Sequence, residues 1–415
     1  MIRKLVVDLR PLRSSPAFAR LYAGSLASGV GSAMTTFAVL FQIWQITHSP
    51  AATGLLALLR AIPLFVLTPL GGTLADRRDR RTIMFASSLA NAFLVALLAV
   101  QALAGWRQVW LLYVVVVMQA SVTSLGQPAR QAILPLLVPR DQVAAARALN
   151  TLSWQLTALA GPVLAGVVVA TWGLRSCYAI DVVSYVFGLI GIAGLPTLIA
   201  NAPPEPHLSA MLSSLKLVGR HRPLLSAFGI DMALTVLAFP IGLMPALNQS
   251  LGGDARTLGI LMSCLGVGGV AAALASGGIT RANRPGASMT VTAVLWCVAV
   301  VGLGLSPGLL AAYVCMIAWG AADILFGIPR GTLVQLASPD EHRGRIAAAN
   351  GIVGNGGPAI GDARAGLLAS AVGAGPALVF GGLCALAATL IVSWKLPEAR
   401  SYEITNSEEA TMERC

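Results

Sequence analysis

Residues 71–82 read GGTLADRRDRRT and separate two long apolar stretches of the chain. The segment places Asp76 and four arginines, Arg77, Arg78, Arg80 and Arg81, at the mouth of an apolar stretch long enough to cross a bilayer. It recurs in a degraded form about half a chain later, where Gly277 matches Gly72 and Arg281 stands opposite Asp76. A charged loop repeated between apolar stretches predicts an internally duplicated membrane protein.

The composition agrees with a membrane protein. Hydrophobic residues make up 56% of the 415 residues and charged residues 11%, and the mean hydropathy is +0.77. Because a membrane-spanning helix needs about 20 mostly apolar residues, we predict an all-α membrane protein with twelve transmembrane helices. The expected spans are 18–46, 51–75, 83–103, 108–137, 142–170, 176–200, 224–249, 257–280, 286–305, 308–337, 345–371 and 375–396. No cleaved signal peptide is expected, because the first span is long and lacks a cleavage-like site.

The basic residues are distributed unevenly between the two sides of the predicted membrane. The net charge is +11, yet the odd-numbered connections hold only Arg107, Arg175 and Arg256. Nearly all other Lys and Arg residues lie in even-numbered connections, at the adjoining span ends or near the termini. This asymmetry places both termini in the cytoplasm, and it explains the charge without a nucleic-acid partner.

The two halves of the sequence match each other. The segments PARQAILPLLVPRDQVAAARALN and IPRGTLVQLASPDEHRGRIAAAN align at an offset of 200 residues. The matched pairs are Arg130 with Arg330, Leu136 with Leu336, Pro139 with Pro339, Asp141 with Glu341, Asn150 with Asn350, and Gly166 with Gly366. We therefore expect a cytoplasmic N-terminal segment (1–17), two pseudo-symmetric six-helix bundles (18–200 and 224–396), a cytoplasmic linker (201–223) and a polar, disordered tail (397–415).

The loop resembles the signature G-x-L-x-D-R-x-G-R-R of the major facilitator superfamily. The matching positions are Gly72, Leu74, Asp76, Arg77, Arg80 and Arg81. Asp79 stands where the family has its second glycine, so a less tight turn is expected there. Within the superfamily the chain is most similar to the branch of enterobactin-type siderophore exporters and macrolide-efflux-like carriers.

The resemblance implies a gating role for the loop. Asp76 would face the N-terminus of the eleventh span, whose free N–H groups favour an anion, and Gly72 would permit close helix approach. Arg77, Arg80 and Arg81 would bind Asp76 or the neighbouring half and close the cytoplasmic side. The alternative is that these arginines only satisfy the topology rule and hold lipid headgroups.

The fifth span carries a second family motif. Gly161, Pro162 and Gly166 resemble the antiporter motif G-x-x-x-G-P-x-x-G-G, although Thr157 and Ala165 depart from it. Proline removes one helical hydrogen bond and bends the span. The resemblance favours export, and a plain structural kink is the competing interpretation.

Charges inside spans are costly and are therefore functional candidates. The candidates for ion coupling or for lining a cavity are Arg60, Asp231, Asp323, Asp362 and Arg364, together with Gln119 where proton-coupled relatives carry an arginine. Asp362 and Arg364 are two residues apart and cannot share a helical face, so each needs another partner. Asp181 is expected to reach the membrane interface. The alternative for each acid is a structural ion pair.

These features predict a secondary active transporter of the bacterial cytoplasmic membrane that exports an organic small molecule by alternating access. The expected substrate is a siderophore or similar metabolite, and the expected coupling ion is a proton. A multidrug or macrolide carrier, a nutrient importer and a non-transporting receptor remain alternatives. No catalytic motif, nucleotide-binding loop or metal-ligand spacing occurs in the sequence, so we expect no enzyme activity, no cofactor and no metal. The expected partners are the substrate, the ion and the bilayer, and a monomer is expected.

Overall fold

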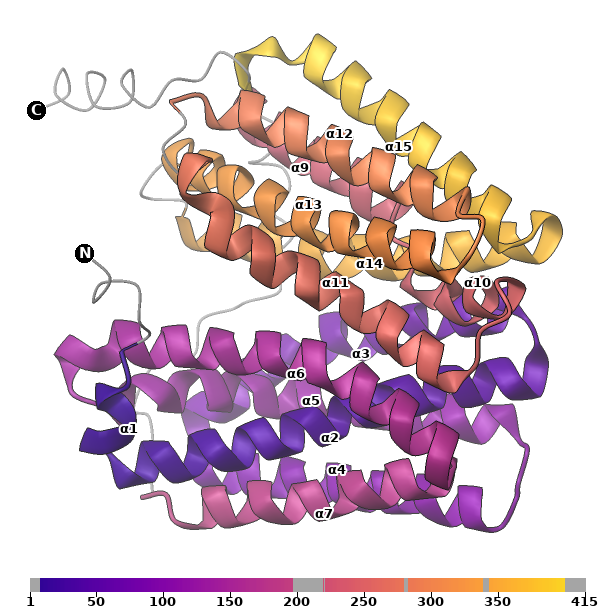
Figure 1. Ribbon diagram of the computed structural model, residues 1–415. Coiled ribbons are helices and arrows are strands. Elements are labelled where there is room, and N and C mark those ends of the chain that lie inside the picture. Colours follow the sequence, from indigo (N-terminus) through magenta and orange to yellow (C-terminus); the bar gives the residue numbers. More distant parts are fainter. Residues whose placement is uncertain (1–7, 197–218, 220, 280–282, 339–342, 400–415) are drawn as a thin grey trace, which may run out of the picture. The chain divides into compact units, whose positions relative to one another are not determined.

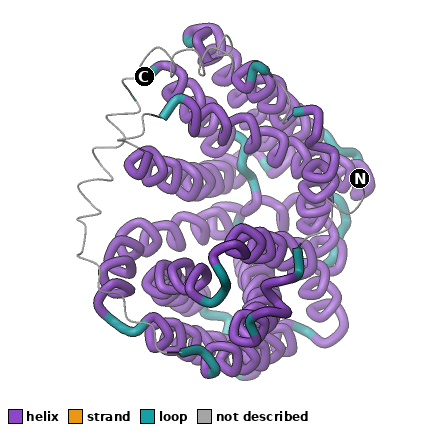
Figure 2. The backbone as a smooth tube through the Cα atoms, turned by 90° about the vertical axis from the view of Figure 1, so that its left-hand side faces the viewer, coloured by secondary structure: helices purple, strands orange, loops and turns teal. Residues whose placement is uncertain are grey.

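The computed structural model describes residues 8–196, 219, 221–279, 283–338 and 343–399. Within these ranges every regular element is a helix, and short loops join the helices (Figure 2). The chain divides into two compact units. Unit 1 comprises Met1–Thr47, Leu59–Glu205 and Asp254–Ser263, and unit 2 comprises His48–Leu58, Pro206–Gly253 and Cys264–Cys415. Each unit therefore contains most of one repeat and a short stretch from the other.

The helices of unit 1 follow the apolar stretches of the first repeat (Figure 1). They are α1 (Arg10–Ser14), α2 (Pro16–Thr47), α4 (Arg80–Leu103), α5 (Val109–Ile133), α6 (Val143–Trp172) and α7 (Leu174–Ala193), with most of α3 (Pro50–Arg77) and the first turns of α11 (Ala255–Ala275). Helices α2 and α7 pack together extensively, and α4 packs against both α5 and α7. The α2–α7 contact therefore forms the interior of the unit.

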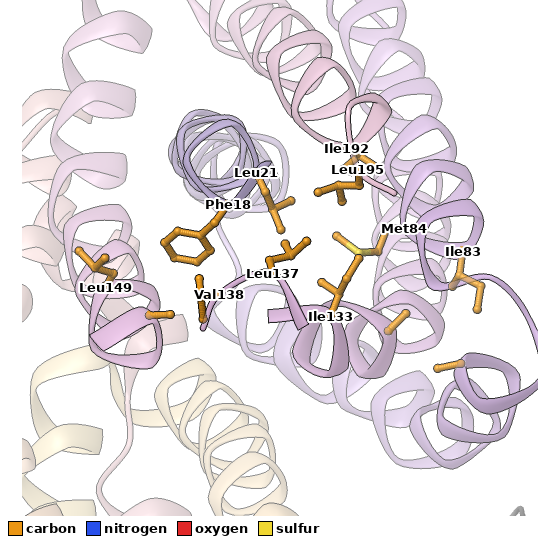
Figure 3. Close-up of a cluster of buried hydrophobic side chains, with 13 residues drawn as sticks. Phe18, Leu21, Ile83, Met84, Ile133, Leu137, Val138, Leu149, Ile192 and Leu195 are labelled. Carbon is orange, nitrogen blue, oxygen red and sulfur yellow. The ribbon is translucent and has the colours of Figure 1, made fainter. Parts of the chain in front are cut away.

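A buried apolar cluster fixes one end of unit 1. Phe18 and Leu21 near the start of α2 point toward Ile133 at the end of α5 and Leu137 just beyond it, and Ile192 at the end of α7 joins them (Figure 3). All five side chains are nearly inaccessible to solvent. Because close packing resists rearrangement, this cluster holds the helix ends that surround the loop at residues 71–82.

The helices of unit 2 belong to the second repeat. They are α9 (Arg222–Leu237), α10 (Met244–Ser250), α12 (Pro285–Gly304), α13 (Leu309–Leu336), α14 (Arg343–Val372) and α15 (Ala374–Lys395), with the rest of α11. Trp296 of α12 and Trp319 of α13 are fully buried and meet edge to face, with ring centroids 6.0 Å apart. Phe239 stands edge-on to Trp319 at 5.6 Å. These aromatic rings form the interior beside α9.

Eleven described helices are long and apolar enough to cross a membrane. The expected span at 345–371 corresponds to α14, which has 30 residues but is not among them. Its interior contains the charges Asp362 and Arg364 and many glycines, which lower its hydropathy. The length of α14 still suffices for a crossing at 1.5 Å per residue, so the twelve-helix architecture stands.

The expected span at 224–249 coincides with a candidate membrane span, Arg222–Ser250, but its helix is interrupted. Helix α9 ends at Leu237, a 3₁₀ turn covers Ile241–Leu243, and α10 begins at Met244. Pro240, which has no N–H group, lies at the break. A broken helix leaves carbonyl and amide groups that need partners inside a membrane, and those partners appear among the charged residues described below.

Two helix crossings made by glycine pairs are related by the repeat. In unit 2, Gly54 of α3 crosses Gly366 of α14, and a Cβ built on Gly54 would lie 3.1 Å from the Gly366 Cα. In unit 1, Gly166 of α6 crosses Gly259 of α11 with the corresponding distance at 3.0 Å. Any side chain at these positions would collide with backbone. The internal repeat thus extends from sequence to the packing of corresponding helices.

Candidate functional site: the charged loop and the buried charges

Most of the segment 71–82 is helical, because α3 continues to Arg77 and α4 begins at Arg80. The carboxylate of Asp79 accepts hydrogen bonds from the backbone N–H of Arg81 at 3.2 Å and from the Thr82 hydroxyl at 3.1 Å. Asp79 is therefore the N-cap of α4. Its φ of −59° requires no glycine, which explains how an aspartate can stand at the position of the family's glycine.

Two arginines of the loop bind helix ends within unit 1. Arg80 Nη1 donates to the carbonyl oxygen of Ala132 at 3.2 Å, and Arg81 Nη2 donates to that of Ala193 at 2.6 Å. Ala132 and Ala193 lie at the C-terminal ends of α5 and α7, where helical carbonyls lack N–H donors and carry partial negative charge. Both arginines thus stabilise the fold of unit 1.

The remaining members of the loop motif are differently placed. Arg77 is exposed and Asp76 is half-buried. Among the described residues, Asp76 makes no hydrogen bond or ion pair. The close helix approach expected at Gly72 occurs at Gly71, where an added Cβ would lie 2.7 Å from the Ser124 carbonyl oxygen of α5. Gly72 itself is half-buried.

The antiporter-like segment lies inside α6, which runs through Pro162 without interruption. Gly161 is in such close contact with Ala33 of α2 that a Cβ would overlap the alanine methyl group. The Ser263 hydroxyl of α11 donates to the Leu159 carbonyl oxygen at 2.8 Å, next to the carbonyl of Ala158 that Pro162 deprives of its helical donor. The three motif residues Gly161, Pro162 and Gly166 therefore pack α6 closely against neighbouring helices of unit 1.

Asp231, one of the acids predicted from sequence, lies beside an arginine in unit 2, and a second predicted acid lies near Asp231. Asp231 Oδ2 of α9 is 2.8 Å from Arg330 Nη2 of α13, and the two side chains are 9% and 13% exposed. Asp231 Oδ2 and the Nε and Nη2 atoms of Arg330 make no hydrogen bond with another described residue. The guanidinium lies 5.4 Å from the ring centre of Phe228. Asp323, two turns before Arg330 on α13, is exposed and close enough to repel Asp231 electrostatically.

The two charges of α14 bind the broken helix. Arg364 Nε donates to the Val236 carbonyl oxygen at 2.9 Å and Nη2 to that of Leu237 at 2.5 Å. Asp362 Oδ1 accepts from the backbone N–H of Gly242 at 2.8 Å. The arginine thus satisfies the free carbonyls where α9 ends, and the aspartate satisfies an amide where the chain resumes. Asp362 and Arg364 therefore have separate partners, as expected for two residues that cannot share a helical face.

Two candidates have no such partner. Arg60 is an exposed side chain of α3 in unit 1, and Gln119 is a half-buried side chain of α5. Neither forms a hydrogen bond or an ion pair with another described residue. The described residues also contain no group of three His, Cys, Asp or Glu side chains that could hold a metal ion.

The buried polar groups of unit 1 were underestimated from sequence. Asp181 was expected at the interface, but it is fully buried between α7 and α2. Arg130 lies inside α5, and its Nη2 donates to the Ser25 hydroxyl of α2 at 3.1 Å. Small hydroxyl residues at spacings of three and four along α2 were the available signal.

Comparison with known proteins places this arrangement in a family. The sequence profile of the family described as transmembrane secretion effector matches residues 7–414. Relatives named enterobactin exporter EntS include those of Citrobacter koseri, 28% identical over 343 residues and 82% of each chain, and of Salmonella typhimurium, 28% identical over 345 residues, 82% of this chain and 83% of that one.

Solved membrane transporters share the fold. A POT family transporter in complex with 5-aminolevulinic acid gives a TM-score of 0.73 at 11% identity, covering 93% of this chain and 97% of that chain. A bacterial homologue of the iron transporter ferroportin gives 0.68 at 17% identity, covering 93% and 99%. The fold confirms the predicted pair of six-helix bundles, and the profile match covers nearly the whole chain. The protein therefore belongs to the transmembrane secretion effector family of the major facilitator superfamily, and it is a multi-pass membrane protein.

Proposed function

We propose that the protein is a secondary active transporter that exports a siderophore, or a similar organic metabolite, across the bacterial cytoplasmic membrane in exchange for protons. It acts as a carrier and not as an enzyme. The relatives named as enterobactin exporters support the substrate class. The observation that carries the mechanism is the group formed by Asp231, Arg330 and Asp323 inside the membrane-spanning part of unit 2.

The charges of this group can couple proton binding to transport. Two carboxylates and one arginine carry one excess negative charge, which is costly in a membrane interior. In the unprotonated group, the carboxylates accept hydrogen bonds from hydroxyl groups of the substrate. Binding of a proton neutralises one carboxylate, removes the excess charge and weakens these hydrogen bonds, so the substrate is released. Release of the proton restores the charge of the carboxylate near Arg330, and the group can bind the next substrate. Proton and substrate therefore occupy the group alternately, as exchange requires.

Asp76 would contribute to the alternation between cytoplasmic and outer access. Its half-buried carboxylate has no described partner, whereas Arg80 and Arg81 are bound to helix ends of unit 1. We assign the gate to Asp76, with Arg77 beside it and Gly72 at the helix end, and not to the other two arginines. Asp76→Asn should slow substrate flux while Arg80→Lys mainly lowers stability. Unchanged flux in Asp76→Asn proteoliposomes would remove the gating assignment.

The test of the function is accumulation of enterobactin in inside-out vesicles. A pH difference of one unit is worth about 1.4 kcal/mol, or a tenfold concentration ratio for one-for-one exchange. Asp323→Asn should abolish accumulation driven by the pH difference but retain exchange between internal and external substrate. Asp254→Asn, an exposed acid outside the spans, is the matched control and should accumulate normally.

The alternatives give different results in the same vesicles. Accumulation of a macrolide but not of enterobactin would identify a drug carrier. Uptake in right-side-out vesicles under the same gradient would identify an importer, and binding without movement would identify a receptor. Cysteine labelling from either side of the membrane tests the proposed cytoplasmic termini, and the sedimentation mass in detergent tests the proposed monomer.

A further inference from the structure

Unit 1 contains a carboxylate that the proposed mechanism does not use. Asp181 of α7 is 0% exposed. Its Oδ2 atom accepts a hydrogen bond from the Thr35 hydroxyl of α2 at 2.5 Å, and its Oδ1 atom accepts one from the Ser184 hydroxyl at 2.9 Å. Both oxygens are thus held by neutral donors from two helices.

The space around this carboxylate depends on a glycine. A Cβ on Gly31 of α2 would overlap both the Ser184 hydroxyl and Asp181 Oδ1. Any other residue at position 31 would push the carboxylate out of its place. Gly31, Thr35 and Ser184 therefore form a cradle of defined shape around Asp181.

No cation neutralises Asp181. Within the described part of the chain, no Lys, Arg or His side chain forms an ion pair with it. An isolated ionised carboxylate in a membrane interior is very unfavourable, whereas the protonated acid is neutral. Asp231 in unit 2 differs, because Arg330 lies beside it.

Further polar side chains of α2 lie on both sides of the cradle along the helix, and together with their partners they are called the polar line. On one side, the Ser32 and Tyr185 hydroxyls are 3.0 Å apart and Ser25 accepts from Arg130 at 3.1 Å. Tyr185 is one helical turn from Asp181 on α7, so these two side chains lie on one face.

Toward the other end of α2, the line continues through buried groups. The Tyr178 hydroxyl donates to Gln42 Oε1 at 2.6 Å, and Gln42 Nε2 donates to Gln101 Oε1 at 3.0 Å. The stretch from residue 25 to residue 42 spans about 25 Å at 1.5 Å per residue, close to the roughly 30 Å of a bilayer core.

The titratable groups that face Asp181 come from few elements. Helix α7 contributes Cys177, Tyr178 and Tyr185, and Arg130 of α5 faces Tyr185. Helices α2 and α4 contribute only hydroxyl and amide groups to the line. Interhelical packing alone needs no carboxylate at the centre of such a line, since Ser, Thr and Gln suffice for hydrogen bonds between membrane helices.

We propose that Asp181 is a proton-binding site of unit 1 and that the polar line on α2 is the route by which protons reach and leave it. The proposal rests on the proposed proton exchange and places a second protonation site in it. Asp181 carries a proton in one stage of the cycle, held among Thr35, Ser184 and Gly31, and releases it along the line in another. The group in unit 2 binds substrate after Asp181 has released its proton, as exchange requires.

The first test measures protonation directly and needs no substrate. Infrared spectra of the purified protein in nanodiscs are recorded as a function of pH for the wild type and Asp181→Asn. A protonated carboxyl C=O band that titrates in the wild type and is missing from Asp181→Asn is expected. Ser184→Ala should shift the frequency of that band without removing it, because one hydrogen bond to the carboxyl group is lost. The absence of any such titrating band would overturn the proposal.

The second test measures coupling. Asp181→Asn keeps the size of the side chain, and in inside-out vesicles it should lose the roughly tenfold enterobactin accumulation expected from one pH unit but retain exchange. In the infrared experiment Asp231→Asn is the matched control, and the titrating band of Asp181 should persist in that variant. Accumulation by Asp181→Asn equal to that of the wild type, or accumulation driven by a sodium gradient instead, would overturn the proposal. If the wild type moves no enterobactin, the proposed function fails while the infrared titration still decides on Asp181.

Discussion

In each repeat, an arginine at a matching position contacts the first membrane helix, but the two contacts differ in kind. In unit 1, α2 runs unbroken over 32 residues, and Ser25 accepts a hydrogen bond from Arg130. In unit 2, the corresponding helix is broken after Leu237, and Asp231 pairs with Arg330. The arginines occupy matching positions of the repeat, but the partner is a neutral hydroxyl in one unit and a carboxylate in the other. The two repeats therefore share the arginine and differ in whether its partner is neutral or charged.

The largest expected effect comes from removing the arginine of the charged pair. Arg330→Met leaves Asp231 buried without a cation, which should lower the free energy of unfolding by about 3–5 kcal/mol. Arg130→Met removes a hydrogen bond to a hydroxyl and should cost only about 0.6–1 kcal/mol. Thermal unfolding in one detergent measures both variants. Equal losses would show that the difference in partner has no energetic meaning.

The next effect concerns the charges at the broken helix. Arg364→Leu leaves the carbonyls of Val236 and Leu237 without their donor, and a lost hydrogen bond to a charged group costs about 1.5–3 kcal/mol. Amide hydrogen exchange should rise in residues 236–243. Arg364→Lys is the control: it keeps the charge but lacks the planar fork that reaches two acceptors, so an intermediate loss is expected. Unchanged exchange in Arg364→Leu would contradict the role of this arginine.

A smaller effect is expected when unit 1 is given the partner of unit 2. Ser25→Asp places a carboxylate beside Arg130 and should change the free energy of unfolding by no more than about 1 kcal/mol, because the arginine compensates it. Ser28→Asp, one turn away on α2 and 7% exposed, lacks such a neighbour and should be clearly destabilising. If both variants unfold at the same temperature, Arg130 is not available as a counter-ion.

The smallest effect is expected for an acid outside the membrane. The carboxylate of Asp254 accepts a hydrogen bond from the backbone N–H of Thr257 at 2.9 Å, at the start of α11. That bond lowers the pKa of Asp254 below its ordinary 3.8. The contribution to stability is therefore complete above pH 3.8 and is lost as the pH falls through the lower, folded value. The melting temperature of the wild type minus that of Asp254→Asn should follow this dependence, and a difference that grows on acidification would contradict it. Because Asp254 is exposed, the effect should be well under about 1 kcal/mol.

Much of the fold could be predicted because it follows from local patterns. Apolar stretches and the placement of arginines predicted the helices, and the matched pairs around Arg130 and Arg330 predicted the repeat. The break after Leu237 was missed, although the Phe239–Pro240 pair was visible, because hydropathy does not register a change in backbone direction.

The charged residues of the site could be predicted from the sequence, but the groups that they contact could not. Charges within spans predicted Asp231, Asp362 and Arg364 as candidates for coupling or for lining a cavity, and the structure places each of them beside a specific partner. The partners of Arg81 and Arg364 are backbone carbonyls, which no residue pattern identifies. Asp181 was misplaced because its depth was judged from its distance to the helix end, while its burial depends on the face that α7 turns toward α2.

The helix ends on either side of the central linker are each fastened to their own unit. Arg81 and Arg20 donate to the carbonyls of Ala193 and Gly194 where α7 ends, and Glu398 pairs with Arg222 where α9 begins. Covalent continuity is therefore not what keeps these ends in place. Because each unit also contains a short stretch from the other repeat, a gene split between the two anchors should yield two polypeptides that fold together when made in the same cell.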